Sequence, residues 1–417
     1  MRVMRRFHPS PHFYVACTAL TILLGFFVFK EVGYHDQYFF VLIAVVAMLW
    51  ASVCFVRQLQ GHSHYSIDRH SPIGVLFKRA LVRYLVWLVV FYAGLAFYES
   101  HPYYSTYERN SQFLNALFAV YLRFGLLYFF LTLKFKASQV EDFYDPAVRL
   151  LLIAKAIILF VVSRRWRDRA RRILRNKTNI KTLLNFIVRG YFIPVMVVQV
   201  YSGLRDGVAL SDGALTGTSL LAVLGWITAL LWLADSLSAS TGYALESRWM
   251  ENRSRSVDLT VSGWVICLCC YPPLNQVTGT LFAFGPTVVS TDPAALVVPS
   301  LGLLYALKIV EVVVLSALVY SDLSLGPSGV NITLKKVQTR GPYGVVRHPA
   351  TVCKLTFWWV QSLFYTAFWT PEMIFGHLMW NVIYILRALS EERHLKQFPE
   401  YREYMKQVRY RFIPGVI

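Results

Sequence analysis

The residues best suited to chemistry lie in two polar blocks near the C-terminus, GPYGVVRHP over 341–349 and EERHL over 391–395. The first block predicts a turn followed by a helix, because Pro349 favours an extended backbone at His348 and fits the first turn of a helix. The start of that helix would present free backbone N–H groups beside the Arg347 guanidinium and the His348 imidazole, which favours a bound carboxylate or phosphate. The alternative is a basic loop that only anchors the next helix at the membrane surface.

The second block contains two adjacent carboxylates, Glu391 and Glu392. Neighbouring side chains on a helix point in different directions, so one carboxylate can pair with Arg347 or Arg387 while the other accepts hydrogen bonds from a ligand. Arg387 and Glu391 are four residues apart and could instead form only a surface ion pair. Together the two blocks suit a zwitterionic cofactor that carries hydroxyl groups.

The stretch between the blocks must position them, and it is apolar enough for two membrane spans, over 352–371 and 373–390. A helical hairpin returns the chain to the side of the membrane that it left. We therefore expect the two blocks to emerge on one side and to contact the same ligand.

The whole chain has the composition of a membrane protein. It is 56% hydrophobic and only 16% charged, which leaves too little polar surface to cover a soluble globule of this length. Because unpaired backbone is too costly in a bilayer, apolar runs of spanning length predict helices. The predicted fold is all-α, a polytopic integral membrane helical bundle of about 10–12 spans. Eleven candidate spans lie near 12–30, 38–56, 81–98, 112–133, 147–163, 183–204, 215–236, 258–275, 294–321, 352–371 and 373–390.

The distribution of basic residues predicts the topology. The loop over 164–181 holds nine Lys or Arg residues against one Asp, so we expect it in the cytoplasm. Counting from this loop places the Arg347–His348 loop and the C-terminus on the cytoplasmic side. Eleven full spans would then leave the basic N-terminus outside, although its charge predicts a cytoplasmic position. We therefore expect either that 147–163, which Arg149 and Lys155 interrupt, does not fully cross or that a twelfth span exists.

The net charge of +19 arises from 42 basic and 23 acidic residues. Basic residues are concentrated in the cytoplasmic loops of membrane proteins, where they also attract anionic lipid head groups, and this accounts for the positive net charge. We therefore expect the membrane and not nucleic acid as partner. The six cysteines lie in or beside apolar spans and predict neither a disulfide framework nor a metal site. His62, His64 and His70 lack clear metal-ligand spacing, and no metal is expected there.

Charged residues within the apolar runs are candidates for a substrate cavity, because ionisable groups are costly in a membrane. Lys308 and Glu311 lie three apart on one predicted helix, and Asp235, Arg189 and Arg123 lie at or near membrane depth. For Lys308 and Glu311, mutual neutralisation is the alternative.

The two blocks and the hairpin together resemble a known signature. GPYGVVRHP, an apolar hairpin and EERHLKQFPEYREYMKQVRYRFIP are similar to the C-terminal region of the isoprenylcysteine carboxyl methyltransferase family and its bacterial membrane relatives, including phospholipid methyltransferase-like proteins. The family pattern approximates GPYxxxRHPxYxG, a hairpin and EExxLxxx(F/Y)GxxYxxY. This chain differs at Thr351, where the family has tyrosine, near Lys354, where it has glycine, and at Pro399, which replaces another glycine.

The resemblance implies an S-adenosylmethionine-dependent methyltransferase of a bacterial inner membrane, with a cytoplasmic cofactor pocket and a lipid or other lipophilic substrate. It covers 338–417 strongly, and a five-span methyltransferase-like core would extend over 215–417, leaving 1–214 as an N-terminal transmembrane region of unknown role. Arg347 and Glu392 are the predicted catalytic residues. The predicted cofactor-binding residues are Tyr343, Arg347, His348, Arg387, Glu391, Glu392, Tyr401 and Tyr404.

The expected reaction is an in-line methyl transfer in which the protein mainly positions the reactants and excludes water. Two other classes stay open at this stage. A membrane reductase resembling the sterol reductases would bind NAD(P)H, although the adjacent glutamates favour the methyl donor. A non-enzymatic transporter or scaffold is the third possibility.

Overall fold

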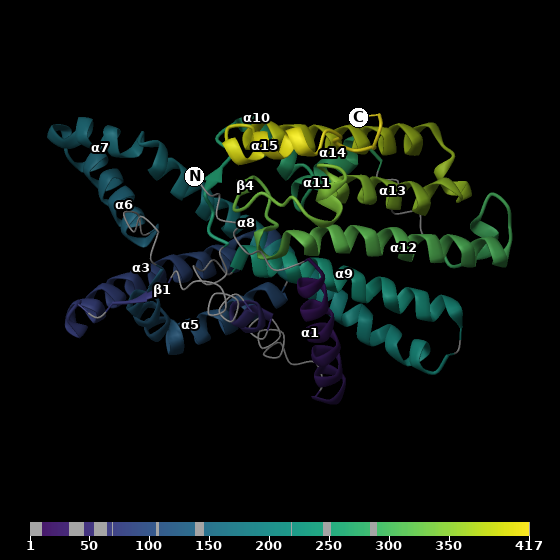
Figure 1. Cartoon of the computed structure of the whole chain (residues 1–417), viewed down its shortest axis with the longest axis horizontal. Helices are drawn as coiled ribbons and strands as arrows, with labels where there is room; N and C mark the ends of the chain where they lie inside the picture. The colour runs from purple at the N-terminus through teal and green to yellow at the C-terminus, as the bar shows by residue number, and fades with distance from the viewer. Residues whose placement is uncertain are drawn as a thin grey trace. The chain divides into compact units, whose positions relative to one another are not determined.

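The computed structural model describes residues 11–32, 46–53, 65–68, 70–105, 108–137, 146–217, 219–244, 252–283 and 290–416. The described chain is helical apart from two short antiparallel ribbons (Figure 1). In one ribbon β1 (Tyr65–Ile67) pairs with β2 (Phe135–Ala137), and in the other β3 (Ser256–Val257) pairs with β4 (Thr333–Leu334). The predicted all-α class is confirmed.

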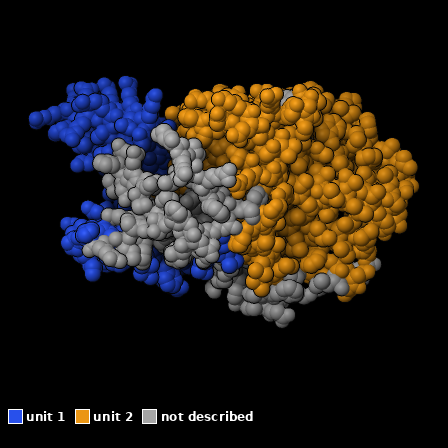
Figure 2. All heavy atoms as spheres, viewed as in Figure 1, with its two compact units in different colours: residues 1–7, 34–194, 247–251 blue, residues 8–33, 195–246, 252–417 orange. Residues whose placement is uncertain are grey.

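The chain divides into two compact units (Figure 2). Unit 1 comprises residues 1–7, 34–194 and 247–251, and unit 2 comprises residues 8–33, 195–246 and 252–417. Helix α1 and residues 195–214 thus belong to unit 2, although the sequence placed them in an N-terminal region. The division into an N-terminal region over 1–214 and a methyltransferase-like core over 215–417 stays a prediction.

Unit 1 is built around the packing of two long helices, α3 and α5. Leu76 and Ala80 of α3 are buried against Leu133 of α5, and the rings of Tyr84 and Tyr121 stack at a centroid distance of 5.2 Å. The described elements of this unit are α3 (Ile73–Ser100), α4 (Pro102–Ser105), α5 (Glu108–Lys134), α6 (Pro146–Val162), η2 (Arg164–Trp166), α7 (Arg167–Leu174) and α8 (Lys177–Leu215) up to residue 194.

Unit 2 is a stack of helices in which α12 packs between α9 and α13, and α13 packs on α14. Figure 1 shows these four helices side by side, with α1 crossing α9 and α12 at a steep angle. Apart from residues 195–215 of α8, the helices are α1 (Pro11–Val32), α9 (Leu220–Ala244), α10 (Val261–Leu268), α11 (Leu274–Leu281), α12 (Leu301–Leu325), α13 (Pro349–Leu363), α14 (Pro371–Leu395) and α15 (Pro399–Gln407), with short 3-10 turns η4 (Pro293–Ala295), η5 (Gly326–Ser328), η6 (Gly341–Gly344) and η7 (Thr366–Phe368).

Six helices within the described ranges are long and apolar enough to cross a membrane: Ile73–Ser100, Leu114–Lys134, Lys177–Ser211, Leu220–Ala244, Leu301–Ser328 and Pro371–Leu395. Each overlaps a predicted span. The predicted span 38–56 lies partly outside the described residues. The run 147–163 forms the 17-residue α6, a short helix as expected.

Two predicted spans differ from the structure. The run 258–275 is not one helix, because α10 ends at Leu268 and α11 begins only after Pro272–Pro273, which cannot continue a helix. The run 352–371 forms α13, which has only 15 residues and ends at Leu363. A helix of that length is shorter than a full span.

The hairpin nevertheless brings its two ends together, as predicted. Helix α13 begins at Pro349, the last residue of the first polar block, and α14 ends at Leu395, the last residue of the second. Tight packing holds α14 in place: a Cβ added at Gly376 would lie 2.2 Å from the carbonyl oxygen of Ala283. The Trp380 indole N–H also donates to the Phe282 carbonyl at 3.3 Å.

Candidate functional site

The first polar block folds as a turn that leads directly into α13. Gly341 opens the 3-10 turn with φ = +64°, a conformation that favours glycine. Pro349 occupies the first turn of α13, as predicted. The His348 backbone, with φ −126° and ψ 57°, is not helical, but its ψ falls short of the predicted extended conformation.

The Glu392 carboxylate lies at the centre of a buried cluster of basic groups. It is 2.8 Å from Arg347 Nε, 3.3 Å from His348 Nε2 and 3.1 Å from Arg411 Nε. The side chains of Glu392 and Arg347 are only 1% and 5% exposed. The cluster therefore ties the motif turn, the end of α14 and the C-terminal segment to one another.

The C-terminal segment completes the motif turn through backbone hydrogen bonds. The Arg347 N–H donates to the Tyr410 carbonyl at 3.0 Å, and the His348 N–H donates to the Arg411 carbonyl at 2.9 Å. The Tyr404 hydroxyl, on α15, donates to the Tyr343 carbonyl at 2.7 Å. Hydrogen bonds thus join the first polar block to α15 and to the C-terminal segment.

Tyr401 and Tyr404 of α15 are buried, together with Val408. Burial raises the pKa of both phenols well above the ordinary value, and the nearby Glu392 carboxylate raises each pKa further. Burial likewise raises the pKa of Tyr343. All three phenols are therefore protonated at neutral pH and can donate hydrogen bonds.

A cavity of about 620 Å³ within unit 2 opens between these elements and α8, α9 and α12. Pockets for cofactors and similar ligands have volumes of roughly 300–1,000 Å³. Seven of the eight predicted cofactor-binding residues line it: Tyr343, Arg347, His348, Arg387, Glu391, Tyr401 and Tyr404. Glu392 does not line the cavity. Its carboxylate lies behind the wall, in the buried cluster.

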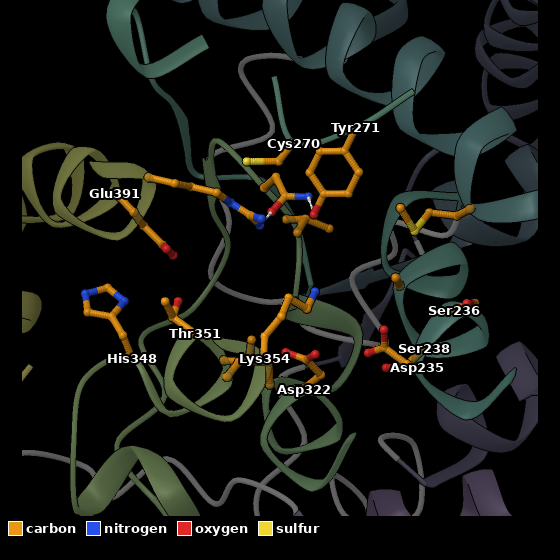
Figure 3. Close-up of a pocket in the computed structure, with 18 of the residues that line it drawn as sticks. Asp235, Ser236, Ser238, Cys270, Tyr271, Asp322, His348, Thr351, Lys354 and Glu391 are labelled. Carbon is orange, nitrogen blue, oxygen red and sulfur yellow. Dashed lines mark hydrogen bonds between the residues drawn. The ribbon is translucent and has the colours of Figure 1, made fainter. Parts of the chain in front are cut away.

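The two adjacent glutamates point in different directions, as the helix geometry predicts. Glu391 is exposed and makes no hydrogen bond or ion pair with any described residue. Figure 3 shows its carboxylate extending from α14 toward the cavity, on the same side as His348 and Thr351. A free carboxylate in a cavity wall can accept hydrogen bonds from ammonium or hydroxyl groups.

The sequence allowed a surface ion pair between Arg387 and Glu391 as an alternative, but the two side chains do not form one. Its guanidinium lies 5.2 Å from the ring centroid of Tyr271 and 5.6 Å from that of Tyr384. It also donates to the side-chain oxygen of Asn331, whose amide nitrogen donates to the Tyr271 hydroxyl at 2.9 Å. Arg387 is thus held rigidly where it lines the cavity.

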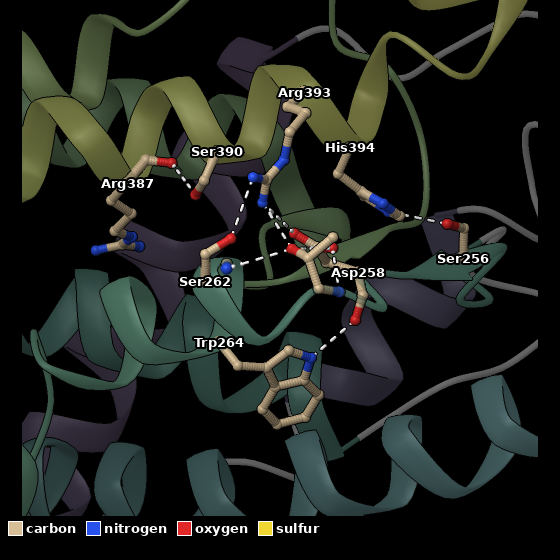
Figure 4. A network of polar contacts seen from close by, with 10 residues as sticks. Ser256, Asp258, Ser262, Trp264, Arg387, Ser390, Arg393 and His394 are labelled. Atoms are coloured by element: carbon tan, nitrogen blue, oxygen red, sulfur yellow. Dashed lines mark hydrogen bonds and ion pairs between the residues drawn. The ribbon is translucent and has the colours of Figure 1, made fainter.

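A second polar network fixes the last turn of α14 (Figure 4). Arg393 donates to the hydroxyls of Ser262 at 3.1 Å and Thr260 at 2.6 Å. The Asp258 carboxylate accepts from the Thr260 backbone N–H and hydroxyl at 2.9 and 2.8 Å. His394 Nε2 lies 2.8 Å from the Ser256 hydroxyl. These contacts attach α14 to β3 and the start of α10, and thereby fix the direction of Glu391.

Sequence reasoning missed one group of cavity residues. Asp235 was noted only as a charge at membrane depth, and Asp322 was not singled out, yet both line the cavity together with Lys354. The available signal was a carboxylate in each of two apolar runs, but the sequence does not show that α9 and α12 are neighbours.

Lys308 and Glu311 form an ion pair at 3.0 Å and do not line the cavity. Their mutual neutralisation is the interpretation that the structure favours. No group of three potential metal ligands occurs among the described residues. His62, His64 and Cys54, for which the sequence predicted neither a metal site nor a disulfide, lie outside the described residues.

A scan against protein-family models, a search of curated proteins and a search of solved structures each found no significant match to this chain. The resemblance to membrane methyltransferases therefore rests on the quoted motif residues alone.

Proposed function

We propose that this protein is an S-adenosylmethionine-dependent methyltransferase that acts on a lipophilic or membrane-associated substrate at the cytoplasmic face of a membrane. The observation that carries the proposal is the free Glu391 carboxylate, which lines one cavity with Arg347 and His348. The two motif blocks thus contribute groups of opposite charge to the same space. A zwitterionic amino-acid moiety requires such an arrangement.

Arg347 is suited to hold the carboxylate end of the cofactor. Its Nε pairs with Glu392 and its Nη1 lies 3.5 Å from the Val408 carbonyl, which leaves Nη2 without a partner among the described residues. Because the guanidinium is fixed by these contacts, little conformational entropy is lost when it binds a ligand. Glu391 would accept hydrogen bonds from the ammonium or ribose hydroxyl groups.

The same carboxylate disfavours the reductase alternative. A nicotinamide dinucleotide carries a diphosphate, and an unpaired carboxylate in the cavity wall would repel it. A sulfonium cofactor carries a positive charge and is attracted by the same group. The charge of Glu391 therefore favours the methyl donor, while Arg347 in the same cavity can hold the carboxylate of that donor.

We assign Glu392 to positioning and not to contact with the ligand, in contrast to the predicted catalytic role. Its carboxylate is buried and orients Arg347, His348 and Arg411. Arg347 remains the candidate for direct contact. Bound S-adenosylmethionine would supply an electrophilic methyl group, and the residues of this chain would orient it and exclude water.

Calorimetric binding measurements on the purified full chain in lipid nanodiscs test the proposal. We expect S-adenosylmethionine to bind and NADPH not to bind. Glu391→Gln removes charge-assisted hydrogen bonds worth about 1.5–3 kcal/mol and should weaken binding by about tenfold to a hundredfold. Glu403→Gln, at an exposed ion pair with Lys406, is the matched control. NADPH binding, or equal donor affinity in wild type and Glu391→Gln, would overturn the proposal.

A further inference from the structure

Unit 1 has a strongly basic surface that the methyltransferase motifs do not involve. It consists of η2, α7 and the turn into α8, residues 164–177, with the sequence RRWRDRARRILRNK, and we call it the arginine face. Its seven arginines and one lysine are all exposed, against a single acidic residue, Asp168. Within the described residues, Asp168 pairs with Arg171 at 3.5 Å and no other ion pair forms in this face. The arginine face therefore carries a large positive charge that the described protein does not neutralise.

The spacing of the arginines is unfavourable for α7 by itself. Arg167, Arg171 and Arg175 follow one another at intervals of four residues, which brings like charges together on the helix surface. Such pairs destabilise a helix, and packing compensates little, because in α7, which is described throughout, only Ala170 is buried. A bound anion would relieve the repulsion between the guanidinium groups. The arrangement thus indicates an anionic partner, whereas the topology rule needs only positive charge.

Part of the arginine face is hollowed. The hollow has a volume of about 470 Å³ and is lined by Asp168, Arg171, Arg172, Arg175 and Asn176. Because Arg171 pairs with Asp168, the groups left for an anion are the guanidinium groups of Arg172 and Arg175. Neither of these forms a hydrogen bond or ion pair with any described residue. A guanidinium presents a planar pair of donors that matches two oxygens of a phosphate, so the hollow is suited to a phosphate group.

An apolar helix, α6, lies directly before the arginine face in the chain. Its side chains Ile158, Val161 and Val162 are 61%, 70% and 78% exposed, and the arginines begin two residues after Val162. The 17 residues of α6 rise about 25 Å, which is less than the hydrocarbon core of a bilayer, about 30 Å. Lys155, half-way along α6, is also exposed. A charge there is costly in hydrocarbon, so α6 is suited to enter one leaflet without crossing.

Aromatic and polar contacts join α6 to the arginine face, and the two helices pack on each other (Figure 1). Arg167 Nε donates to the Phe160 carbonyl at 3.3 Å, and the Arg171 guanidinium lies 5.7 Å from the centroid of the Phe160 ring. The Arg169 guanidinium lies 5.6 Å from the ring centroid of Trp166, which is 41% exposed. Tryptophan is enriched where a membrane meets water. The apolar helix and the basic helix thus form one amphipathic element with a tryptophan at their junction.

We propose that the arginine face binds the phosphate groups of anionic phospholipids, with α6 inserted beside it among the acyl chains. A zwitterionic head group is a poorer match, because it brings an ammonium that the arginines repel. A nucleic acid offers similar phosphates, but it has no apolar part for the exposed side of α6. The distribution of basic residues predicts only a side of the membrane, whereas this inference assigns a lipid site to Arg172 and Arg175. It does not depend on the proposed methyltransferase function.

Native mass spectrometry of the full chain, released from detergent micelles with added lipid, measures which lipids stay bound. We expect the wild type to bind phosphatidylglycerol at least about tenfold more tightly than phosphatidylcholine, because each Lys or Arg near an anionic head group adds to the attraction. The double variant Arg172→Gln and Arg175→Gln should weaken phosphatidylglycerol binding at least about tenfold and leave phosphatidylcholine binding unchanged. The matched control, Arg402→Gln and Arg409→Gln, removes the same charge from exposed positions of unit 2 and should bind as the wild type does.

Three results would overturn the inference. An equal loss of phosphatidylglycerol affinity in both double variants, or no loss in either, would show that Arg172 and Arg175 form no site. Equal binding of the two lipids by the wild type, a comparison that needs no variant, would show no preference for an anionic head group. Displacement of phosphatidylglycerol by a short DNA duplex or by inorganic phosphate, at the same phosphate concentration, would assign the face to a soluble ligand. None of these measurements involves S-adenosylmethionine, so their failure leaves the proposed function unaffected.

Discussion

At the residue scale, Glu391 and Glu392 show how two identical neighbours acquire different roles. Glu392 points into a cluster of basic groups and is 1% exposed, whereas Glu391 points into the cavity and has no partner among the described residues. Removal of one partner from a buried ion cluster is costly because the remaining charges are left uncompensated. Glu392 should therefore control stability and Glu391 ligand affinity.

Glu392→Gln tests this division of roles. We expect it to lower the free energy of unfolding by about 3–5 kcal/mol, because Arg347 and Arg411 lose their counter-charge. Denaturant titration in detergent measures the change. Glu391→Gln and Glu403→Gln should each change it by less than about 1 kcal/mol. A Glu392→Gln protein as stable as the wild type would contradict the positioning role.

The buried phenols predict a loss of stability in alkali. Burial raises the pKa of Tyr343, Tyr401 and Tyr404 in the folded protein, whereas the unfolded value is about 10. The folded state therefore binds these protons more tightly. Its stability advantage is complete below about pH 10 and is lost as the pH rises toward the folded values.

Tyr404→Phe removes one of these phenols and its 2.7 Å hydrogen bond to the Tyr343 carbonyl. We expect about 1 kcal/mol lower stability at pH 7, and a shallower decline above about pH 10. Unfolding curves at a series of pH values would show both effects. If the free energy of unfolding of the variant fell above about pH 10 as steeply as that of the wild type, Tyr404 would not contribute to the loss of stability in alkali.

At the element scale, the hairpin illustrates what the sequence could and could not predict. Pro349 and the apolar run correctly predicted where α13 begins and that both blocks share one end of the hairpin. The length of α13 was missed, because hydropathy does not show that the chain leaves the helix at Leu363. The cavity carboxylates Asp235 and Asp322 were missed because their place in one cavity depends on the contact between α9 and α12, which are far apart in sequence.

Helix packing at Gly376 gives a prediction for α14. A Cβ at this position would lie 2.2 Å from the Ala283 carbonyl oxygen, so Gly376→Ala must displace backbone. We expect a loss of about 1–3 kcal/mol from overpacking. Gly279→Ala on α11 is the matched control, because nothing lies within 4 Å of its added Cβ, and it should be neutral or slightly stabilising. Equal melting temperatures for both variants would contradict the packing of α14.

At the scale of the whole molecule, six described helices are long and apolar enough to span a membrane. The basic loop over 164–181 predicts that the motif turn and the C-terminus face the cytoplasm. A fluorescent protein fused after Ile417 should therefore be fluorescent in bacteria, and a periplasmic alkaline phosphatase fused there should be inactive. The reverse pattern would place the candidate cofactor site on the wrong side for a cytoplasmic methyl donor.

The most direct test of the central claim is to locate the bound methyl donor. Ultraviolet crosslinking of labelled S-adenosylmethionine to the purified protein, followed by peptide mapping, shows which residues it contacts. We predict label in the segments 341–351 and 387–404, suppressed by excess unlabelled donor and reduced in Glu391→Gln. Label confined to other segments, or labelling that excess donor does not suppress, would contradict the assignment of this cavity to a methyl donor.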